Sequence, residues 1–359
     1  MRAIIESGLA LALLSAVLGF IAGAGVYVFS INRLLGYLRD SLIKSILLPS
    51  TLFLVIGGWC LWGILSPRTA LPFTMTVLVG MALGEIGTSL LRRFERGAPP
   101  ISTSGPLVTW RHPLTTTALQ VIQYQVPVAG WQGPALRIAQ LSDWHVSEKL
   151  PLEYFHQAIA QSNQKSPDLV FLTGDFITKL SDLRFLLELL QAVESRLGTY
   201  AILGNHDYWA DAGKVSACLR QAGVHMLHNG WEQLLIDDKR RVLILGCEDP
   251  WGDDRWEPPN IQNADLVLAL SHTADHIYRL QKAGAQVVFS GHYHAGQIQL
   301  PVLGPVIIPS KYGKRFQRGH FLIRGAHLFV SAGIGGVQPP ARIYCPPDIL
   351  IVDIVPSSG

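Results

Sequence analysis

Hydrophobic positions divide the chain into an apolar front and a longer, alternating remainder. Three long apolar runs occupy residues 8–31, 45–65 and 71–91. A helix needs about 20 apolar residues to cross a bilayer, so each run predicts a transmembrane helix and residues 1–96 form a membrane region. A cleaved signal peptide is the alternative for the first run. It is disfavoured because a signal's apolar core spans only about 7–15 residues and further apolar runs follow.

Two polar features mark the later runs. Trp59 and Trp62, near the end of the second run, are typical of an interfacial aromatic belt. The third run contains Glu85. Two interpretations of this residue stay open, because an intramembrane carboxylate is either functional or placed near an interface or a helix contact.

Basic residues in the flanks predict the orientation, since short cytoplasmic loops carry an excess of Lys and Arg. One side of the membrane would hold six of them and the other side two: Arg33, Arg39, Lys44, Arg92, Arg93 and Arg96 against Arg2 and Arg68. With three spans, the basic segments that follow the first and the third span lie on the same side of the membrane. We therefore expect a multi-pass protein of a bacterial-type inner or plasma membrane, with an outside N-terminus and a cytoplasmic C-terminal domain.

The remainder alternates between strand-like and helical patterns. Residues 97–106 are rich in Pro, Ser and Gly and predict a linker, and residues 107–359 predict one domain. Strand-like runs cover residues 136–143, 168–175, 199–207, 241–249, 264–272 and 285–294. Helical spacing follows the first three, at 153–164, 183–197 and 211–223. This alternation predicts an α/β fold with a largely buried sheet.

Composition supports a membrane part and excludes several other classes. Hydrophobic residues make up 49% of the 359 residues and charged residues 15%, and the mean hydropathy is +0.28, which is too apolar for an ordinary soluble domain. The net charge of +3 comes without a dense basic patch, so no nucleic-acid partner is expected. The four cysteines lie far apart without a CxxC, which argues against a disulfide framework or a thiolate zinc site.

Five strand-like runs end in residues that can bind metals. In open α/β sheets, ligands bind beyond the carboxyl ends of the strands, so these runs direct their last residues to one edge. The residues are Asp143, His145, Asp175, Asn205, His206, His272, His292 and His294. Each fragment alone has an ordinary explanation, such as a turn or a helix cap. Their ordered occurrence at five strand ends indicates a site.

The donor types narrow the chemistry. Carboxylate, amide and imidazole groups without sulfur suit manganese, iron or zinc. Eight such residues exceed the needs of one ion. Two ions about 3.5–4 Å apart, bridged by a carboxylate, would use them and form a clamp for phosphoryl chemistry. The sequence shows no Ser/His/Asp triad and no phosphate-binding P-loop motif.

The ordered series D-x-H, GD, GNHD, H and GH-x-H resembles the calcineurin-like metallophosphoesterases over about residues 100–359. The resemblance implies a four-layer α/β/β/α sandwich with a dinuclear centre at one edge. It also implies the site roles. Asp143, His145 and His294 would hold the first metal, Asn205, His272 and His292 the second, Asp175 would bridge both, His206 would be catalytic and Asp207 a structural support.

Finer motifs resemble the membrane-associated phosphodiesterase branch, which includes UDP-diacylglucosamine pyrophosphatases of lipid A synthesis. The motifs are LSHTAD (270–275), GHYHAGQ (291–297), the segment 300–321 and ARIYCPPDILIVDI (341–354). The chain departs from the branch at Ala274 (for Pro), Tyr293 (for Thr), Ala295 (for Gly) and Asp348 (for Glu). These substitutions leave every implied metal ligand in place.

We therefore expect a membrane-anchored enzyme with two divalent ions, manganese first and iron or zinc as alternatives. It would hydrolyse a phosphodiester or pyrophosphate by direct in-line attack of water, with His206 protonating the leaving oxygen or stabilising charge. The expected partners are the lipid bilayer and a phosphoester or lipid-nucleotide substrate such as UDP-diacylglucosamine. Expected substrate contacts are Tyr293, Lys311, Tyr312 and Arg315, with Lys314 beside them.

Several alternatives stay open. The basic segment at 311–315 has the alternative of a solvated turn, and the acidic loop at 248–254 is either a lid or an ordinary loop. A general phosphodiesterase with a non-lipid substrate is the first functional alternative. A non-enzymatic membrane receptor or scaffold is the second, although such a protein would be expected to lose ligands. A phosphoprotein phosphatase is disfavoured because GD continues as Phe-Ile-Thr rather than the D-R-G of that branch. The sequence does not set the oligomeric state.

Overall fold

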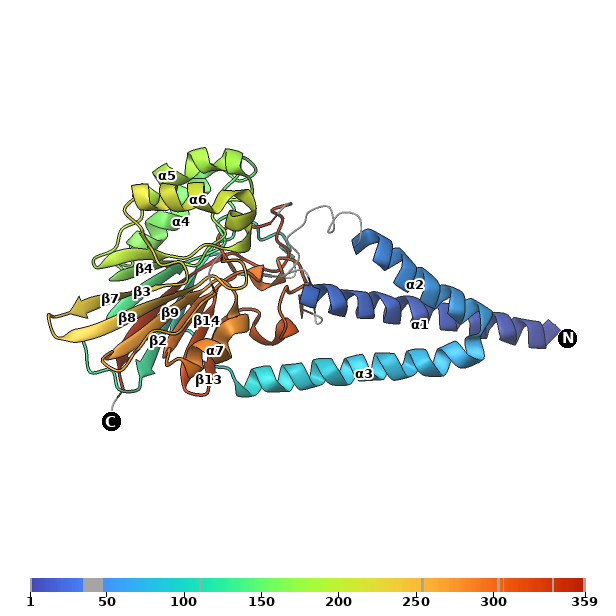
Figure 1. Ribbon diagram of the computed structural model, residues 1–359. Coiled ribbons are helices and arrows are strands. Elements are labelled where there is room, and N and C mark those ends of the chain that lie inside the picture. The colour runs from blue at the N-terminus through green and yellow to red at the C-terminus, as the bar shows by residue number, and fades with distance from the viewer. Residues whose placement is uncertain are drawn as a thin grey trace. The chain divides into compact units, whose positions relative to one another are not determined.

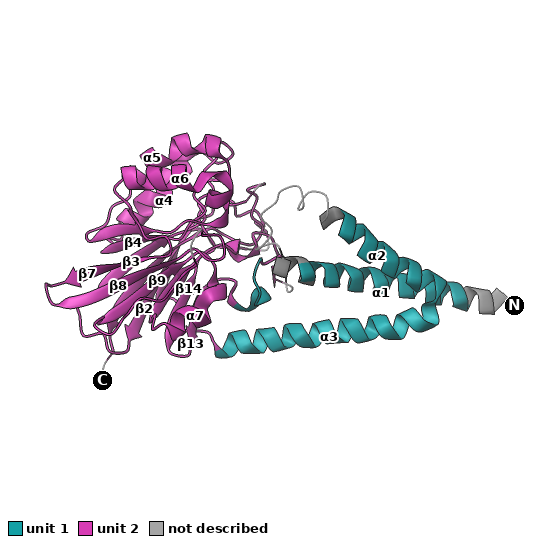
Figure 2. Cartoon of the chain, viewed as in Figure 1, with its two compact units in different colours: residues 1–94, 309–315 teal, residues 95–308, 316–359 magenta. Residues whose placement is uncertain are grey.

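The computed structural model describes residues 2–34, 48–109, 111–252, 255–301, 304–305, 307–337 and 339–357. The chain forms two compact units (Figure 2), a helical unit of Met1–Phe94 with Pro309–Arg315 and a sheet unit of Glu95–Ile308 with Phe316–Gly359. Two of the basic residues used for the orientation, Arg39 and Lys44, lie outside the described residues, as do Asp253 and Asp254 of the acidic loop.

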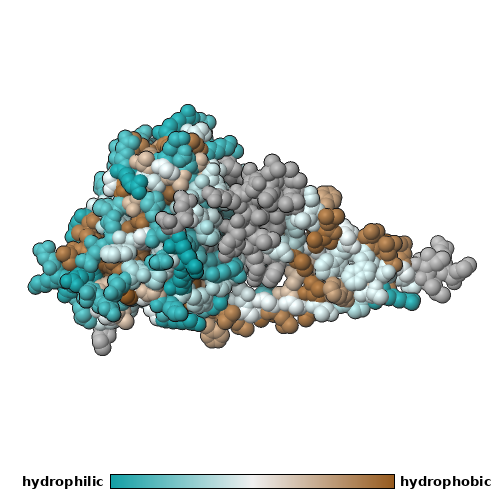
Figure 3. Space-filling model, viewed as in Figure 1, coloured by the Kyte–Doolittle hydropathy of each residue, from teal (hydrophilic) through white to brown (hydrophobic). Residues whose placement is uncertain are grey.

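The helical unit contains α1 (Arg2–Leu34), α2 (Leu48–Leu65) and α3 (Pro67–Phe94). Within the described residues, Ser7–Val28 and Pro67–Phe94 are long and apolar enough to cross a membrane, and Ser50–Leu65 is a shorter apolar helix. Large apolar side chains are exposed along these helices, as Figure 3 shows in brown; Phe53 is 82% exposed and Leu83 63%. Exposed apolar surface of this extent marks a site of contact with a membrane or a protein.

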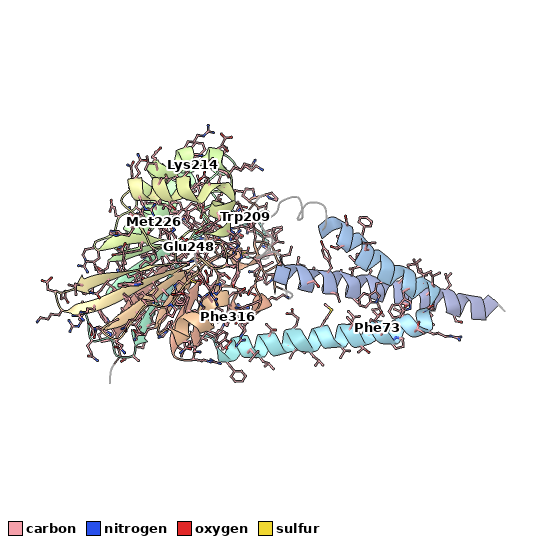
Figure 4. The ribbon with its side chains drawn as sticks, viewed as in Figure 1. Phe73, Trp209, Lys214, Met226, Glu248 and Phe316 are labelled. Atoms are coloured by element: carbon pink, nitrogen blue, oxygen red, sulfur yellow. The ribbon has the colours of Figure 1, made fainter. Side chains whose placement is uncertain are left out.

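Small residues and aromatic contacts connect the three helices. A Cβ atom on Gly63 of α2 would lie 2.9 Å from the Ser15 backbone of α1, so glycine permits this close approach. The Trp59 indole donates a hydrogen bond to Thr74 Oγ1 (2.8 Å), and its ring lies 5.8 Å from that of Phe73, labelled in Figure 4. In the same unit, Glu85 Oε2 lies 3.3 Å from Lys314 Nζ. The carboxylate thus has a basic partner.

The first sheet of the sheet unit has seven strands in the order β1-β2-β15-β3-β4-β5-β6. Their bounds are β1 Ser102–Ser104, β2 Gln120–Val128, β3 Leu136–Leu141, β4 Leu169–Leu172, β5 Gly198–Ala201, β6 His225–Met226 and β15 Asp348–Pro356. Strands β3 to β6 are mutually parallel. Strand β15 runs parallel to β2 and antiparallel to β3, so the C-terminal strand lies inside the sheet.

The second sheet has six strands in the order β13-β14-β10-β9-β8-β7. Their bounds are β7 Trp231–Ile236, β8 Arg240–Cys247, β9 Leu266–Ser271, β10 Val287–Ser290, β13 Gly319–Ile323 and β14 Ala326–Val330. Strands β8, β9, β10 and β14 are parallel, and β7 and β13 pair antiparallel at the two edges. A small two-stranded sheet pairs β11 (Gln299–Leu300) with β12 (Gly304–Pro305).

Helices cover the outer faces of the two sheets (Figure 1). They are α4 (Leu152–Asn163), α5 (Leu183–Gln191), α6 (Asn205–Gln221) and the short α7 (Ile277–Lys282). One core joins α4, α5 and α6 to the first sheet through Phe155, Leu189 and Leu219, and a second lies between the sheets around Phe171 and Phe289. Helix α7 packs beside β13. The α/β sandwich of two sheets with flanking helices is therefore confirmed.

Several elements differ from the pattern of the sequence. Helix α6 begins at Asn205, inside the run 199–207 that was predicted as a strand, and β5 already ends at Ala201. Strand β1 falls within the stretch expected to be a linker, because Ser102–Ser104 pair antiparallel with β2. Helix α5 ends at Gln191 rather than near residue 197. Its end is fixed by Asn163, whose side chain donates to Ala192 O (2.8 Å) and accepts from Glu194 N (3.1 Å). These polar contacts replace the helical hydrogen bonds that would continue α5.

Candidate metal centre

Two groups of ligand atoms meet at the carboxyl ends of the parallel strands, and they share one carboxylate. The first is Asp143, His145, Asp175 and His294, and the second is Asp175, His272 and His292. Within each group the atoms lie within 4.8 Å of one another, and all these residues are buried. They follow β3, β4, β9 and β10, as the strand-end pattern predicts. Asp175 is the member that joins both groups.

The first group is held at short range. The Nε2 atoms of His145 and His294 are 3.1 Å apart. Asp143 Oδ1 lies 3.3 Å from His294 Nε2, and Asp175 Oδ2 lies 3.4 Å from His145 Nε2. Two imidazole nitrogens at this separation need a proton or a cation between them. With two carboxylates beside them, the arrangement fits a divalent cation.

The second group contains ring nitrogens that the protein leaves unsatisfied. Within the described part of the chain, His272 Nε2 and His292 Nε2 are buried without a hydrogen-bond partner, and so is Oδ1 of the predicted ligand Asn205. His272 Nε2 lies 3.3 Å from Asp175 Oδ2. Burial of a polar atom without a partner costs free energy, and such atoms in a native fold call for a bound ion or water. The donors therefore fit a second cation beside Asp175.

Hydrogen bonds behind the ligands fix their orientation. His272 Nδ1 lies 2.6 Å from the Thr173 carbonyl, which only accepts, so Nδ1 carries the proton and Nε2 is left for a metal. His145 Nδ1 lies 2.9 Å from Thr178 Oγ1. Such outer partners set the tautomer of a metal-binding histidine. Thr173 and Thr178 were not predicted from the sequence, although Thr173 directly precedes the GD motif and Thr178 follows it by three residues.

Asp207 supports the centre from behind, as expected from the resemblance. Its Oδ2 accepts from Asp175 N (2.8 Å) and Gly204 N (2.9 Å), and its Oδ1 accepts from Phe176 N (2.8 Å) and Ile177 N (3.2 Å). The carboxylate therefore ties the loop after β4 to Gly204, the residue before α6. The loop after β4 carries the predicted ligand Asp175, and α6 begins with the predicted ligand Asn205.

The ligand loops adopt an uncommon backbone. Five of the seven ligand positions have a positive φ: Asp143 (51°), His145 (42°), Asp175 (58°), His292 (69°) and His294 (48°). Non-glycine residues seldom adopt this region, and such strain concentrates at functional sites. A Cβ atom on Gly291 would lie 2.2 Å from Asp143 Oδ2. Glycine before His292 thus allows the loop to approach the Asp143 carboxylate.

Arg342 and Cys345 brace the His294 loop from the protein interior. The Arg342 guanidinium is fully buried and donates to the carbonyls of Ala332 (2.6 Å) and Gly335 (2.6 Å), and its Nη2 lies 3.3 Å from His294 Nδ1. Cys345 Sγ lies 3.2 Å from the His294 carbonyl. The R-x-x-C motif was visible in the sequence, but nothing in its pattern indicated this supporting role.

Electrostatics favour a cation at the centre. Burial lowers the pKa of His292 and His294 well below the usual value, so both rings are neutral, as metal ligands require. Burial also opposes a charge on His272, but the Asp175 carboxylate outweighs it and raises the pKa of His272 to about 9. A field that draws a proton to this ring also draws a metal ion to the same place.

His206 differs from the ligands in its exposure. It is half-buried near the start of α6, and its backbone N–H donates to Asp175 Oδ1 (2.8 Å). The ring centroid lies 4.7 Å from His145 and 4.7 Å from Trp209. The side chain therefore borders the metal groups and is reachable from solvent, which suits proton transfer to a substrate.

The residues expected to contact substrate lie in different parts of the protein. Tyr293 is only 1% exposed, and its hydroxyl donates to Asp275 Oδ1 (3.0 Å) and lies 2.9 Å from Thr273 Oγ1. The side chain thus fastens the histidine loop to the segment after β9, and its contact with a substrate stays a prediction. Lys311, Tyr312 and Arg315 belong to the helical unit, so their role stays a prediction.

Trp251 was not identified from the sequence. Its ring lies 5.0 Å from His292 and 5.5 Å from His272, so an indole borders the second group. The loop that carries it is fastened by Arg279, which contacts the Asp249 carboxylate and the Trp256 carbonyl. The acidic composition of this loop suggested a lid or a plain loop, and only the fold places Trp251 at the site.

Comparisons with known proteins agree with this geometry. The model of the family "Calcineurin-like phosphoesterase" matches residues 136–296, which include all seven predicted ligands. The chain is 30% identical to the uncharacterized metallophosphoesterase YkuE of Bacillus subtilis, over 67% of this chain and 85% of that protein. It is 26% identical to the phosphodiesterase YaeI of Escherichia coli, over 74% and 98% respectively.

A third relative is the UDP-2,3-diacylglucosamine pyrophosphatase LpxG of Chlamydia muridarum, 27% identical over 69% of this chain and 94% of that protein. The chain belongs to the calcineurin-like phosphoesterase family. It is accordingly a metal-dependent hydrolase of phosphoric esters or pyrophosphates, and its buried Asp/His groups form the candidate dinuclear centre.

Proposed function

We propose that this enzyme is anchored in a membrane and hydrolyses a lipid-linked phosphodiester or pyrophosphate, with UDP-diacylglucosamine as the preferred substrate type. The observation that carries the proposal is the pair of ligand groups joined at Asp175, in a chain that also contains apolar helices. The similarity to LpxG supports the choice of a lipid-nucleotide substrate.

Two divalent ions would be held by the residues described above, Asp143, His145 and His294 on one side, Asn205, His272 and His292 on the other, and Asp175 between them. When bound, the ions activate water and neutralise charge on the phosphoryl group. Manganese is our first choice and iron or zinc the alternatives, because the donors mix carboxylate, amide and imidazole.

The protein's own groups perform the remaining steps. His206, half-buried beside the groups, would give a proton to the leaving oxygen, a contribution of about 10²–10⁴-fold in general acid catalysis. The Asp207 carboxylate keeps the loop that carries Asp175 and the start of α6 with Asn205 in place. Trp251 and Trp209 line the approach to the second group and to His206.

The membrane arrangement is part of the proposal. We infer three spans within residues 1–96, a connection at 97–106, and a catalytic domain at 107–359 on the cytoplasmic side. Exposed apolar side chains along α1, α2 and α3 support a lipid environment. The cytoplasmic side agrees with a nucleotide-linked substrate, and Lys311, Tyr312 and Arg315 would contact its phosphate or headgroup. In the helical unit, the cations of Lys311 and Arg315 lie 5.1 and 5.8 Å from the Tyr312 ring.

A general phosphodiesterase with a non-lipid substrate is the second candidate. It is favoured by the similarity to the phosphodiesterase YaeI, which covers 98% of that protein. Both candidates share the metal centre and differ in what lies on either side of the reacting phosphorus.

The deciding experiment is incubation of the purified full chain in detergent with Mn²⁺ and UDP-diacylglucosamine, followed by mass spectrometry. We expect release of UMP, and we expect His206→Ala to lose this release. Bis(p-nitrophenyl) phosphate serves as the control substrate. If the control is cleaved and UMP is not released, the lipid-nucleotide substrate is refuted and the general phosphodiesterase remains.

A further inference from the structure

A polar cavity of about 340 Å³ lies beside helix α6 in the sheet unit. Tyr208, Ser216 and Arg220 line it from α6, and His228, Asn229 and Glu248 line it from the connections before β7 and after β8. Ligand pockets of proteins occupy about 300–1,000 Å³, so this cavity can hold one small group.

Glu248 is the centre of the lining and is only 1% exposed. Its Oε1 accepts from Leu203 N (2.6 Å). Its Oε2 accepts from the Tyr208 hydroxyl and lies 3.2 Å from His228 Nδ1. Figure 4 places Glu248 beneath the helical layer. Three protein donors therefore already share this carboxylate, which leaves it little capacity to bind or repel a ligand itself.

The hydrogen bonds among Arg220, His228 and Glu248 leave N–H donors of Arg220 for a ligand in the cavity. Arg220 Nη2 lies 2.9 Å from His228 Nε2. A guanidinium only donates, so Nε2 of His228 accepts and its Nδ1–H points to Glu248. Within the described residues, one of the five N–H groups of Arg220 is used in this way, and the side chain is exposed. The cavity thus offers N–H donors to a ligand rich in oxygen.

The cavity and the metal centre share two pieces of chain. Leu203, bound by Glu248, precedes Asn205 by two residues, and Tyr208 follows His206 by two residues on α6. On the other side, Trp251 lies three residues after Glu248 and borders His272 and His292. The start of α6 and the loop after β8 thus connect residues of the cavity wall to residues that border the metal groups.

We propose that this cavity is the nucleoside subsite of the enzyme and holds the sugar and base attached to the reacting phosphate. Arg220 donates to oxygen atoms of the nucleoside, and the small residues of α6 on that wall, including Gly213, leave room for it. The inference rests on the proposed nucleotide-linked substrate and assigns the part of the protein that recognises it.

The test is inhibition of bis(p-nitrophenyl) phosphate hydrolysis by UMP, ribose 5-phosphate and inorganic phosphate, with the full chain in detergent. We expect UMP to inhibit at a concentration about tenfold lower than phosphate, with ribose 5-phosphate between them. Arg220→Met removes the donor, and Gly213→Trp fills the cavity from a position where a Cβ meets nothing closer than 3.5 Å. In both variants, the inhibition constants of UMP and of phosphate should lie within about twofold of each other.

Lys214→Met is the matched control on the same helix, because Lys214 pairs with Asp211 (3.0 Å) and is absent from the cavity lining. This variant should keep the preference for UMP. Inhibition constants report only on active molecules, so partial misfolding of a variant does not change their ratio. Equal inhibition by UMP and phosphate in the wild type would overturn the subsite, as would an unchanged preference in both cavity variants. The assay needs only phosphodiester cleavage, so its outcome is independent of whether UDP-diacylglucosamine is hydrolysed.

Discussion

Asp207 organises the candidate metal centre although it is not among the predicted ligands. Its two oxygens accept four backbone N–H groups, three from the loop that carries Asp175 and one from Gly204, the residue before Asn205. The carboxylate is fully buried, so these N–H groups depend on it for their hydrogen bonds. The position of Asp175 therefore depends on a side chain behind it.

Replacing Asp207 by Asn should destabilise the protein and weaken catalysis. An amide keeps one acceptor oxygen and turns N–H donors toward backbone donors, so at least one buried N–H loses its partner at a cost of about 1–3 kcal/mol. Thermal unfolding and kcat for bis(p-nitrophenyl) phosphate measure the two effects. Glu188→Gln makes the same chemical change at a side chain that is 73% exposed and should stay within about 0.5 kcal/mol. Equal unfolding temperatures for both variants would contradict the supporting role.

The residues that meet at the candidate metal centre were predictable because each follows an apolar run, and the carboxyl ends of parallel strands meet at one edge. Tyr293 and Arg342 were not. Their burial depends on which distant segments pack against them, Asp275 in one case and the turns after β14 in the other. Contacts between such distant segments cannot be predicted from local sequence patterns.

At the scale of elements, the segment before β15 supports the histidine loop between β10 and β11. Arg342 and Cys345 lie in this segment and contact His294 and the carbonyls after β14. Strand β15 then continues between β2 and β3. The C-terminal segment thus joins the first sheet to the metal-binding edge of the second.

Replacing Arg342 by Met should loosen this junction. The buried carbonyls of Ala332 and Gly335 would lose their donor, which predicts a loss of about 2 kcal/mol or more in unfolding free energy and weaker metal binding. Chemical denaturation and metal titration measure the two effects. Arg184→Met removes an arginine that is 61% exposed and should leave both nearly unchanged. If Arg342→Met matched Arg184→Met, the segment before β15 would have no bracing role.

Six strands and three helices of the sheet unit follow from the periodicity of apolar positions: β3, β4, β5, β8, β9, β10, α4, α5 and α6. The end of α5 at Gln191 could not be predicted from this periodicity, because it is set by Asn163 on another helix. Strand β1 was not predicted because Ser102–Ser104 are polar and exposed. These residues form a strand by pairing with β2.

At the scale of the molecule, the enzyme combines a helical unit and a sheet unit in one chain. The sandwich of two sheets was predicted from the family resemblance rather than from periodicity. The placement of β15 inside the first sheet was not predicted, because strand order depends on pairings between residues more than 200 positions apart, such as Leu350 with Gln140. The membrane orientation rests on basic residues and needs its own test.

The proposed cytoplasmic location can be measured by cysteine labelling in intact cells. Lys239→Cys places a thiol in an exposed turn between β7 and β8, while Cys218, Cys247 and Cys345 are buried. With Cys60 replaced by Ala, a membrane-impermeant maleimide should label the variant only after the cells are permeabilised. Labelling of intact cells at the same level would place the catalytic domain outside and contradict the proposed orientation.

The most direct test of the central claim is the metal stoichiometry of the active enzyme. Metal-free full-length protein is titrated with Mn²⁺ while bound metal and hydrolysis of bis(p-nitrophenyl) phosphate are followed together, for the wild type and for Asp175→Asn. We predict two ions per wild-type chain, with activity rising as the second ion binds. Asp175→Asn should bind fewer ions and lose activity by about 10²-fold or more, since even outer partners of a metal site contribute 10–100-fold. Full activity with a single ion, or an unchanged Asp175→Asn variant, would contradict the dinuclear centre.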